Sequence, residues 1–174
     1  NVALRFENEG TQGTVFHVYD RLHLDRIPRR YTVEAGKSLR DEWQTRSDDG
    51  RYHLEVFGTN GYFRAYRGGG SGDEGALEAS LAYEPATKSV LLTLTNKSNR
   101  ATELHVESTI YGGVEPWTAR LEANRAQSRT WHIGANGNWY DLQVTATAAP
   151  DFLRHCGGRM ETGQAATSDP AMGA

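Results

Sequence analysis

The feature that most constrains the fold is an internal repeat. Residues 2–56 align with residues 90–144 at an offset of 88 positions without a gap, and thirteen aligned pairs are identical. After a two-residue insertion the match resumes, pairing residues 62–64 with 152–154 and Gly68 with Gly158. A repeat of this length indicates two copies of one structural unit. We predict a first copy over residues 1–67, a flexible glycine-rich linker over 68–76, a second copy over 77–158 and a polar tail over 159–174.

Apolar and polar residues alternate in both copies, which is the two-residue period of a half-buried β-strand. Val2, Leu4 and Phe6 share one face of such a strand, and Phe16 and Val18 share one face of the next. No stretch carries a convincing helical period. About six short strands per copy predict an all-β chain of two small antiparallel sandwiches in tandem.

The position of one tyrosine in each copy narrows the choice of sandwich topology. Tyr52 and Tyr140 each follow a turn residue by four positions, which is the spacing of the tyrosine corner in immunoglobulin-like folds, where the hydroxyl bonds to the backbone just upstream. Trp43 and Trp131 precede these tyrosines by nine positions and are predicted to be core residues. The pattern favours Greek-key, immunoglobulin-like sandwiches, although hairpin meanders would give similar alternation.

The second copy has one additional predicted strand, at residues 77–83, followed by a turn at residues 84–87. At the 88-residue offset the counterpart of this strand in the first copy would precede Asn1. We therefore expect the first sandwich to lack its opening strand here or to obtain that strand elsewhere.

The composition excludes several classes of protein. With 37% hydrophobic and 24% charged residues, the chain has the makeup of a folded globular protein. Its longest apolar run is three residues, whereas a membrane-spanning helix needs roughly 20. The net charge of −3 gives no indication of nucleic-acid binding. A single cysteine, Cys156, excludes an internal disulfide framework and a Cys-rich zinc site.

The repeat also helps to distinguish structural residues from functional ones, because a residue kept in both copies is expected to stabilise the shared fold. The matched pair His17 and His105 is therefore interpreted as structural and not as a metal site. The spacing Gly70-x-Gly72-x-x-Gly75 resembles a dinucleotide-binding loop but falls in the linker, and Cys156 is expected to pack. We assign no catalytic residue, metal or cofactor, although spacing alone does not exclude a Ser/His/Asp triad.

Residues found in only one copy are the candidates for function. The segment over residues 20–30 contains four arginines that its counterpart lacks, Arg21, Arg26, Arg29 and Arg30, which could bind phosphate or a lipid surface. The interleaved Asp20 and Asp25 favour the alternative of a salt-bridged, solvated loop. Trp117 and Trp139, with Tyr111, are also specific to one copy. They could contact a lipid surface, a sugar or a neighbouring domain, with plain packing as the alternative.

Several strings resemble one protein family: residues 16–21 (FHVYDR), 28–39 (PRRYTVEAGKSL), 140–145 (YDLQVT) and the tail 158–163 (GRMETG). The chain resembles the C-terminal domain of bacterial phosphocholine-preferring phospholipases C, which is typically repeated in tandem after a larger catalytic domain. The resemblance implies an exported parent, secreted or periplasmic, that hydrolyses phosphatidylcholine or sphingomyelin to release phosphocholine.

The family's catalytic motifs have no matching position here, so no catalytic residue is carried over. The resemblance implies two partners, the upstream catalytic domain of the same polypeptide and a phospholipid surface. Because the chain starts at Asn1 without an initiator Met or a leader, we expect it to be cut or processed from something longer. Two alternatives stay open, a free-standing carbohydrate- or protein-binding module and an undetected hydrolase.

Overall fold

The computed structural model describes residues 1–69, 73–165 and 167–173. In this part of the chain the regular structure consists of thirteen strands and five short 3-10 helices, which confirms the predicted all-β class. None of these helices has the length and hydropathy needed to cross a membrane. The predicted linker falls partly on residues 70–72, which lie outside the described residues.

The described residues of the first copy form six strands, as the alternation predicts. They are β1 (Val2–Glu7), β2 (Thr14–Asp20), β3 (Arg29–Val33), β4 (Ser38–Trp43), β5 (Tyr52–Phe57) and β6 (Phe63–Gly68), with the 3-10 helix η1 (Arg46–Asp48) between β4 and β5.

The second copy repeats this order after one additional strand, β7. Its elements are η2 (Asp73–Ala76), β7 (Leu77–Glu84), η3 (Pro85–Thr87), β8 (Ser89–Asn96), β9 (Thr102–Glu107), β10 (Trp117–Leu121), β11 (Arg125–His132), η4 (Gly134–Asn136), β12 (Trp139–Ala146) and β13 (Ala149–Arg159). The tail ends in η5 (Pro170–Gly173).

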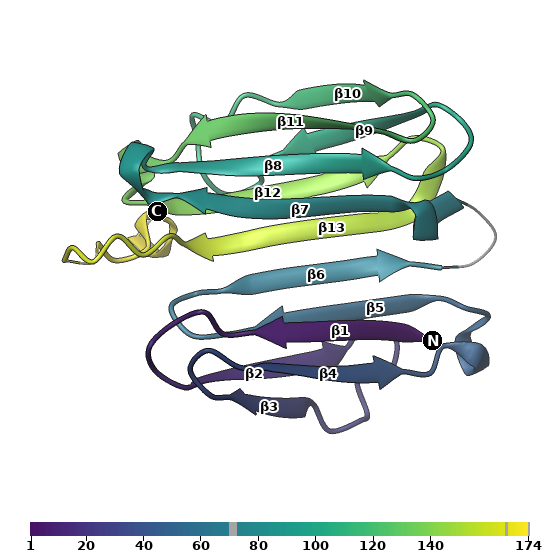
Figure 1. Ribbon diagram of the computed structural model, residues 1–174, viewed down its shortest axis with the longest axis horizontal. Helices are drawn as coiled ribbons and strands as arrows, with labels where there is room; N and C mark the ends of the chain where they lie inside the picture. Colours follow the sequence, from purple (N-terminus) through teal and green to yellow (C-terminus); the bar gives the residue numbers. More distant parts are fainter. Residues whose placement is uncertain (70–72, 166, 174) are drawn as a thin grey trace.

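Each copy is built of two layers (Figure 1). In the second copy the sheet β11-β8-β7 packs against β10-β9-β12-β13, and in the first copy β1-β4 packs against β3-β2-β5-β6. The chain changes layer from β8 to β9, from β10 to β11 and from β11 to β12. Such crossings characterise Greek-key sandwiches and exclude a simple meander.

The two copies share one sheet. β6 pairs antiparallel with β13, so that the described strands of both copies form an eight-stranded sheet in the order β10-β9-β12-β13-β6-β5-β2-β3. Figure 1 shows these two strands side by side at the centre of the molecule. The contact is symmetric, because β6 and β13 are equivalent strands of the repeat. Arg64 lies opposite Cys156, and their repeat equivalents Arg154 and Tyr66 also lie opposite each other.

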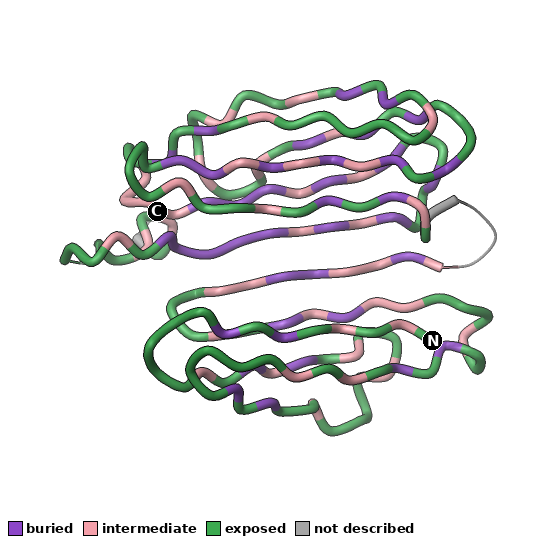
Figure 2. Tube along the Cα trace, in the orientation of Figure 1, coloured by how far each residue is buried: buried purple, intermediate pink, exposed green. Residues whose placement is uncertain are grey.

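Each copy has its own hydrophobic core between its two layers. Trp43 and Trp131 are 6% and 5% exposed, which confirms both as core tryptophans. The core of the second copy is larger and includes the β7 residues Leu77 and Ala79. Figure 2 shows the buried positions concentrated on the strands of the second copy and along the shared sheet.

The hydrogen bond predicted for the tyrosine corner, from the tyrosine hydroxyl to the backbone just upstream, is not formed in either copy. Tyr52 and Tyr140 do stand at the start of β5 and β12, but neither hydroxyl bonds to the backbone upstream. The Tyr52 hydroxyl accepts a hydrogen bond from Arg154 at 3.1 Å, and the Tyr140 hydroxyl bonds to that of Tyr83 at 2.6 Å. Both side chains point toward the joint between the copies. There Gly68 makes room, since a Cβ atom on it would lie 2.8 Å from the Tyr52 hydroxyl oxygen.

Candidate functional site

Two buried arginines hold the joint between the copies. Arg64 and Arg154 occupy equivalent positions on β6 and β13 and are 8% and 6% exposed. Arg64 Nη1 donates to the carbonyl of Gly157 at 3.0 Å, and Arg154 Nη1 donates to the carbonyl of Arg67 at 3.0 Å. Each bond runs from one copy to the other. These two arginines therefore join the copies through hydrogen bonds to main-chain oxygens, and each guanidinium also reaches a tyrosine hydroxyl, Tyr83 for Arg64 and Tyr52 for Arg154.

The outer face of the shared sheet has a row of aromatic rings that sequence reasoning missed. We call the set Tyr19, Phe57, Phe63 and His155 the outer-face stripe; it crosses the neighbouring strands β2, β5, β6 and β13. Successive ring centroids are 5.6, 5.1 and 5.1 Å apart. Tyr19 and Phe57 are 37% and 41% exposed, so this apolar surface remains open to a partner.

A buried carboxylate anchors one end of the stripe. Asp141 bonds to His155 Nε2, and its second oxygen accepts hydrogen bonds at 2.8 Å from the backbone N–H and the hydroxyl of Thr109. Burial works against ionisation, but the hydrogen bonds from His155 and Thr109 outweigh it and lower the pKa of Asp141. The carboxylate therefore fixes the orientation of the His155 ring.

The stripe could have been found from the repeat. Its members lie at outward positions of four neighbouring strands, and their counterparts in the repeat are Glu107, Thr145, Leu153 and Ala65. Aromatic rings present in one copy and absent at the matching position of the other were the available signal.

The four loop arginines lie at the end of the first copy and three of them form ion pairs. Arg21 lies 3.5 Å from Glu55, and Arg26 lies 3.5 Å from Asp20. Arg29 belongs to β3, where it donates to Asp41 at 2.8 Å and its guanidinium lies 4.6 Å from the centroid of the Trp43 ring. The fourth, Arg30, is exposed on β3. The arrangement resembles the salt-bridged alternative more than a phosphate cradle.

The two candidate tryptophans are packed. Trp117 is half-buried on β10 and meets Trp131 edge to face at 5.9 Å. Trp139 donates through Nε1 to the carbonyl of Thr167 in the tail at 3.0 Å and covers Gly61 of the first copy. The structure does not bring Trp117 and the arginines together, because β10 and β3 are opposite edges of the shared sheet. Seven strand spacings separate them, about 33 Å.

The matched histidines have ordinary surroundings. His17 lines a hollow of about 250 Å³ together with Tyr19, Arg21 and Phe57. His105 bonds to the hydroxyls of Thr118 and Thr147 at 3.1 and 2.7 Å. Among the described residues no group of three or more His, Cys, Asp or Glu side chains could hold a metal ion. Cys156 is buried, and burial raises the pKa of its thiol.

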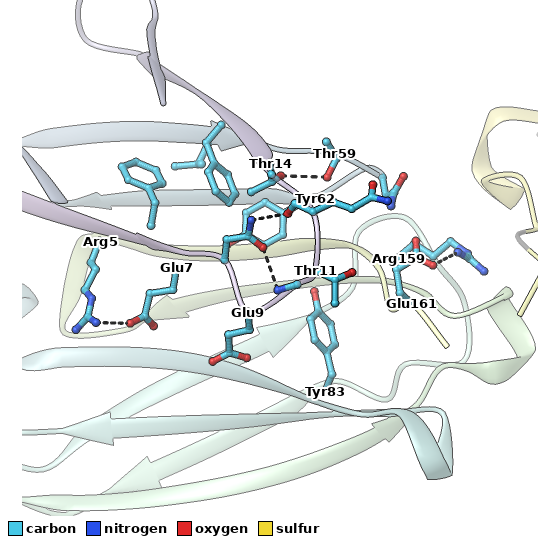
Figure 3. Close-up of a pocket in the computed structure, with 18 of the residues that line it drawn as sticks. Arg5, Glu7, Glu9, Thr11, Thr14, Thr59, Tyr62, Tyr83, Arg159 and Glu161 are labelled. Atoms are coloured by element: carbon cyan, nitrogen blue, oxygen red, sulfur yellow. Dashed lines mark hydrogen bonds and ion pairs between the residues drawn. The ribbon is translucent and has the colours of Figure 1, made fainter. Parts of the chain in front are cut away.

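A groove of about 840 Å³ runs beside β1 (Figure 3). Its floor includes Phe16, Tyr62 and Tyr66 of the first copy. Its other wall comes from the second copy, with Tyr83 and Arg159. We call it the β1 groove. It lies over the shared sheet and between the front layers of the two copies.

Comparison with known proteins gives the family. The model of the family "Bacterial phospholipase C, C-terminal domain" matches twice, at residues 1–69 and 77–159. The chain is 37% identical over 99% of its length to a non-hemolytic phospholipase C of Pseudomonas aeruginosa, and 36% identical over 96% to one of Burkholderia pseudomallei. A hemolytic phospholipase C of Pseudomonas aeruginosa is 31% identical over 94% of the chain.

The chain spans about a quarter of these relatives, covering 25%, 24% and 24% of their lengths. Among solved structures, a DUF3823 family protein from Bacteroides ovatus covers 91% of this chain and is itself covered to 96%, at 9% identity and a TM-score of 0.24, which has no bearing on the fold. The two family matches coincide with the two copies of the repeat and confirm the resemblance seen in the sequence. The chain belongs to the family of bacterial phospholipase C C-terminal domains.

Proposed function

We propose that this chain is the accessory C-terminal part of an exported bacterial phospholipase C whose catalytic machinery lies in the rest of the polypeptide. The observation that carries the proposal is the match of the whole chain to only a quarter of each relative. The parent would release phosphocholine from phosphatidylcholine or sphingomyelin outside the cytoplasm. This assignment of lipid and compartment comes from the resemblance.

The accessory part works by binding the catalytic part of the same polypeptide. The outer-face stripe supports this role, because Tyr19 and Phe57 leave apolar rings exposed on the outer face of the shared sheet. Arg21 borders the same hollow and adds a charged rim. Arg26 and Arg30 are exposed in the same part of the first copy, whereas Arg29 is turned toward β4, where it pairs with Asp41. Trp117 and Trp139 act within the domain pair, where they pack.

The test compares three proteins on phosphatidylcholine and on a chromogenic phosphodiester: the full-length parent, the parent lacking residues 1–174, and the segment 1–174 alone. We expect the segment alone to give no turnover, with or without added zinc or calcium. The truncated parent should keep its active site but lose thermal stability. Turnover by the segment that a point mutation within residues 1–174 abolishes would contradict the proposal.

A second arm separates protein binding from lipid binding. Each basic side chain near an anionic surface contributes about 1 kcal/mol, screened within a Debye length of roughly 8–10 Å. Co-sedimentation of the segment with anionic vesicles at low and high salt, compared with a variant carrying Ala at Arg21, Arg26, Arg29 and Arg30, measures that contribution. Salt-sensitive binding that the variant loses would assign these arginines to lipid. Equal behaviour of both proteins favours the catalytic part.

A further inference from the structure

The two copies differ in how one equivalent strand is paired. β8 lies between β7 and β11, whereas its counterpart β1 pairs with β4 alone among the described strands. Val90 and Leu92 on β8 are fully buried, at 0% exposure, but the equivalent Val2 and Leu4 on β1 are only half-buried. One long edge of β1 thus presents backbone groups that could pair with another strand.

The β1 groove lies where β7 lies in the second copy. There, Leu77 and Ala79 of β7 join the core. That core also contains Leu104, Val144, Phe152 and Cys156. The repeat equivalents of these four residues are Phe16, Val56, Tyr62 and Tyr66, and all four line the β1 groove. The groove is therefore the empty counterpart of an occupied site in the same molecule.

Polar side chains give a second, independent indication. Arg154 forms an ion pair with Glu78 of β7, with 3.4 Å between Nε and Oε1. Its equivalent Arg64 is just as buried, but no carboxylate in the described part of the chain pairs with it. In addition, Arg159, which lines the groove, has a buried Nε atom with no hydrogen-bond partner within the described residues.

We propose that an extended segment of the polypeptide preceding Asn1 adds as an antiparallel strand to the free edge of β1, fills the β1 groove and completes the first sandwich. The inference does not depend on the activity of the parent. We assign the strand to the same polypeptide for two reasons. β7 reaches β8 through a connection of only four residues, Pro85 to Lys88, and the relatives extend well beyond the part that this chain matches.

The β7–β8 register defines the chemistry of this strand. Leu77 pairs with Asn96, Ala79 with Leu94 and Leu81 with Leu92. When this register is transferred to the first copy by the 88-residue offset of the repeat, the incoming strand occupies the fifth to twelfth positions before Asn1. Apolar side chains at the eighth, tenth and twelfth positions face Tyr62 and Tyr66, and an acidic side chain at the eleventh position, equivalent to Glu78, pairs with Arg64.

Hydrogen exchange provides the first test. The backbone amides of β1 are compared in the chain Asn1–Ala174 and in the same protein extended by its natural preceding segment. We expect exchange of the β1 amides directed away from β4 to slow by at least about tenfold in the extended protein. Amides on the outer edge of β4 are the control, because its counterpart β11 is also an edge strand. Their exchange should not change.

A graft provides the second test. A duplicate of residues 77–88 is joined directly to Asn1, which reproduces the connection from Lys88 to Ser89. We expect the graft to raise Tm by at least about 4 °C. The matched control has one glycine inserted between the graft and Asn1, which turns every side chain of the added strand to the opposite face. The control should show no such gain.

Three results would overturn the proposal. The first is unchanged exchange of β1 in the extended protein. The second is equal stabilisation by the graft and by its glycine-shifted control, which would show that the gain does not depend on the register of the added strand. The third is protection of β1 that rises with protein concentration in the chain Asn1–Ala174 itself, together with dimer formation, because that would assign the edge of β1 to a second copy of the chain.

Discussion

Replacing Arg154 by Met tests whether the buried joint holds the two copies together. The substitution keeps much of the side-chain volume but removes three hydrogen bonds: to the carbonyl of Arg67 at 3.0 Å, to that of Leu153 at 2.9 Å and to the Tyr52 hydroxyl at 3.1 Å. Hydrogen bonds from a charged donor each contribute about 1.5–3 kcal/mol, and the acceptors left behind are part-buried.

The expected loss for Arg154→Met is about 3–5 kcal/mol, the range for removing one partner from a buried charged network. The ion pair with Glu78 contributes little of this, because the Glu78 side chain is 50% exposed and exposed pairs contribute at most about 1 kcal/mol. Glu78→Gln should therefore be far milder than Arg154→Met. The difference between the two variants measures the three hydrogen bonds of Arg154, of which those to Arg67 and Tyr52 cross the joint.

The assay is urea unfolding followed by tryptophan fluorescence, since Trp43 reports on the first copy and Trp131 on the second. We expect the midpoint to fall and a single transition to separate into two as the copies uncouple. Arg120→Met is the control, because Arg120 is 74% exposed in its pair with Glu122 and should cost no more than about 0.5 kcal/mol. If Arg154→Met is no more destabilising than Arg120→Met, the joint does not depend on this arginine.

Three further perturbations have definite expected outcomes. Tyr83→Phe should destabilise by about 1–3 kcal/mol in urea and more than Tyr140→Phe, because the Tyr140 hydroxyl is buried whereas that of Tyr83 can reach water; equal effects would contradict this. The folded-state pKa of Asp141 is lowered, so its contribution is present above the unfolded value of about 4 and is lost as pH falls through the folded pKa. Asp141→Asn should therefore flatten the acid side of a stability profile, and an unchanged profile would count against the buried carboxylate. Gly61→Ala should lower Tm, because Gly61 has φ +71° and an added Cβ would lie 2.6 Å from the Trp139 ring; Tm equal to that of the parent would show that Trp139 yields freely.

The layers within each copy could be predicted from sequence because they depend on local periodicity. The alternation around Phe16 and Val18 placed β2, and the nine-residue step from Trp43 to Tyr52 placed both residues correctly on β4 and β5. The additional strand β7 also follows from its own alternation. These features need only neighbouring residues on one strand, so a single sequence contains the whole signal.

The joint between the copies could not be derived in the same way. The pairing of β6 with β13 joins residues about ninety positions apart, and an edge strand has the same alternation whether or not another strand pairs with it. A signal was nevertheless present. Arg64 and Arg154 match in the repeat at inward positions of their strands, where a shared arginine needs buried acceptors. The tyrosine-corner prediction failed for a related reason, since the Tyr52 hydroxyl takes one of these arginines as its partner.

The symmetric pairing of β6 with β13 makes the contact isologous, the same patch of one copy meeting its own equivalent in the other. Such a surface is self-complementary, so each copy presents an edge that fits a second molecule of itself as well as it fits its neighbour in the chain. Joining the copies in one polypeptide replaces a concentration-dependent association by an intramolecular one, whose effective concentration depends on the length of the connection and not on the concentration of protein. Dilution would dissociate a pair of separate copies, whereas the covalent pair remains assembled at any concentration.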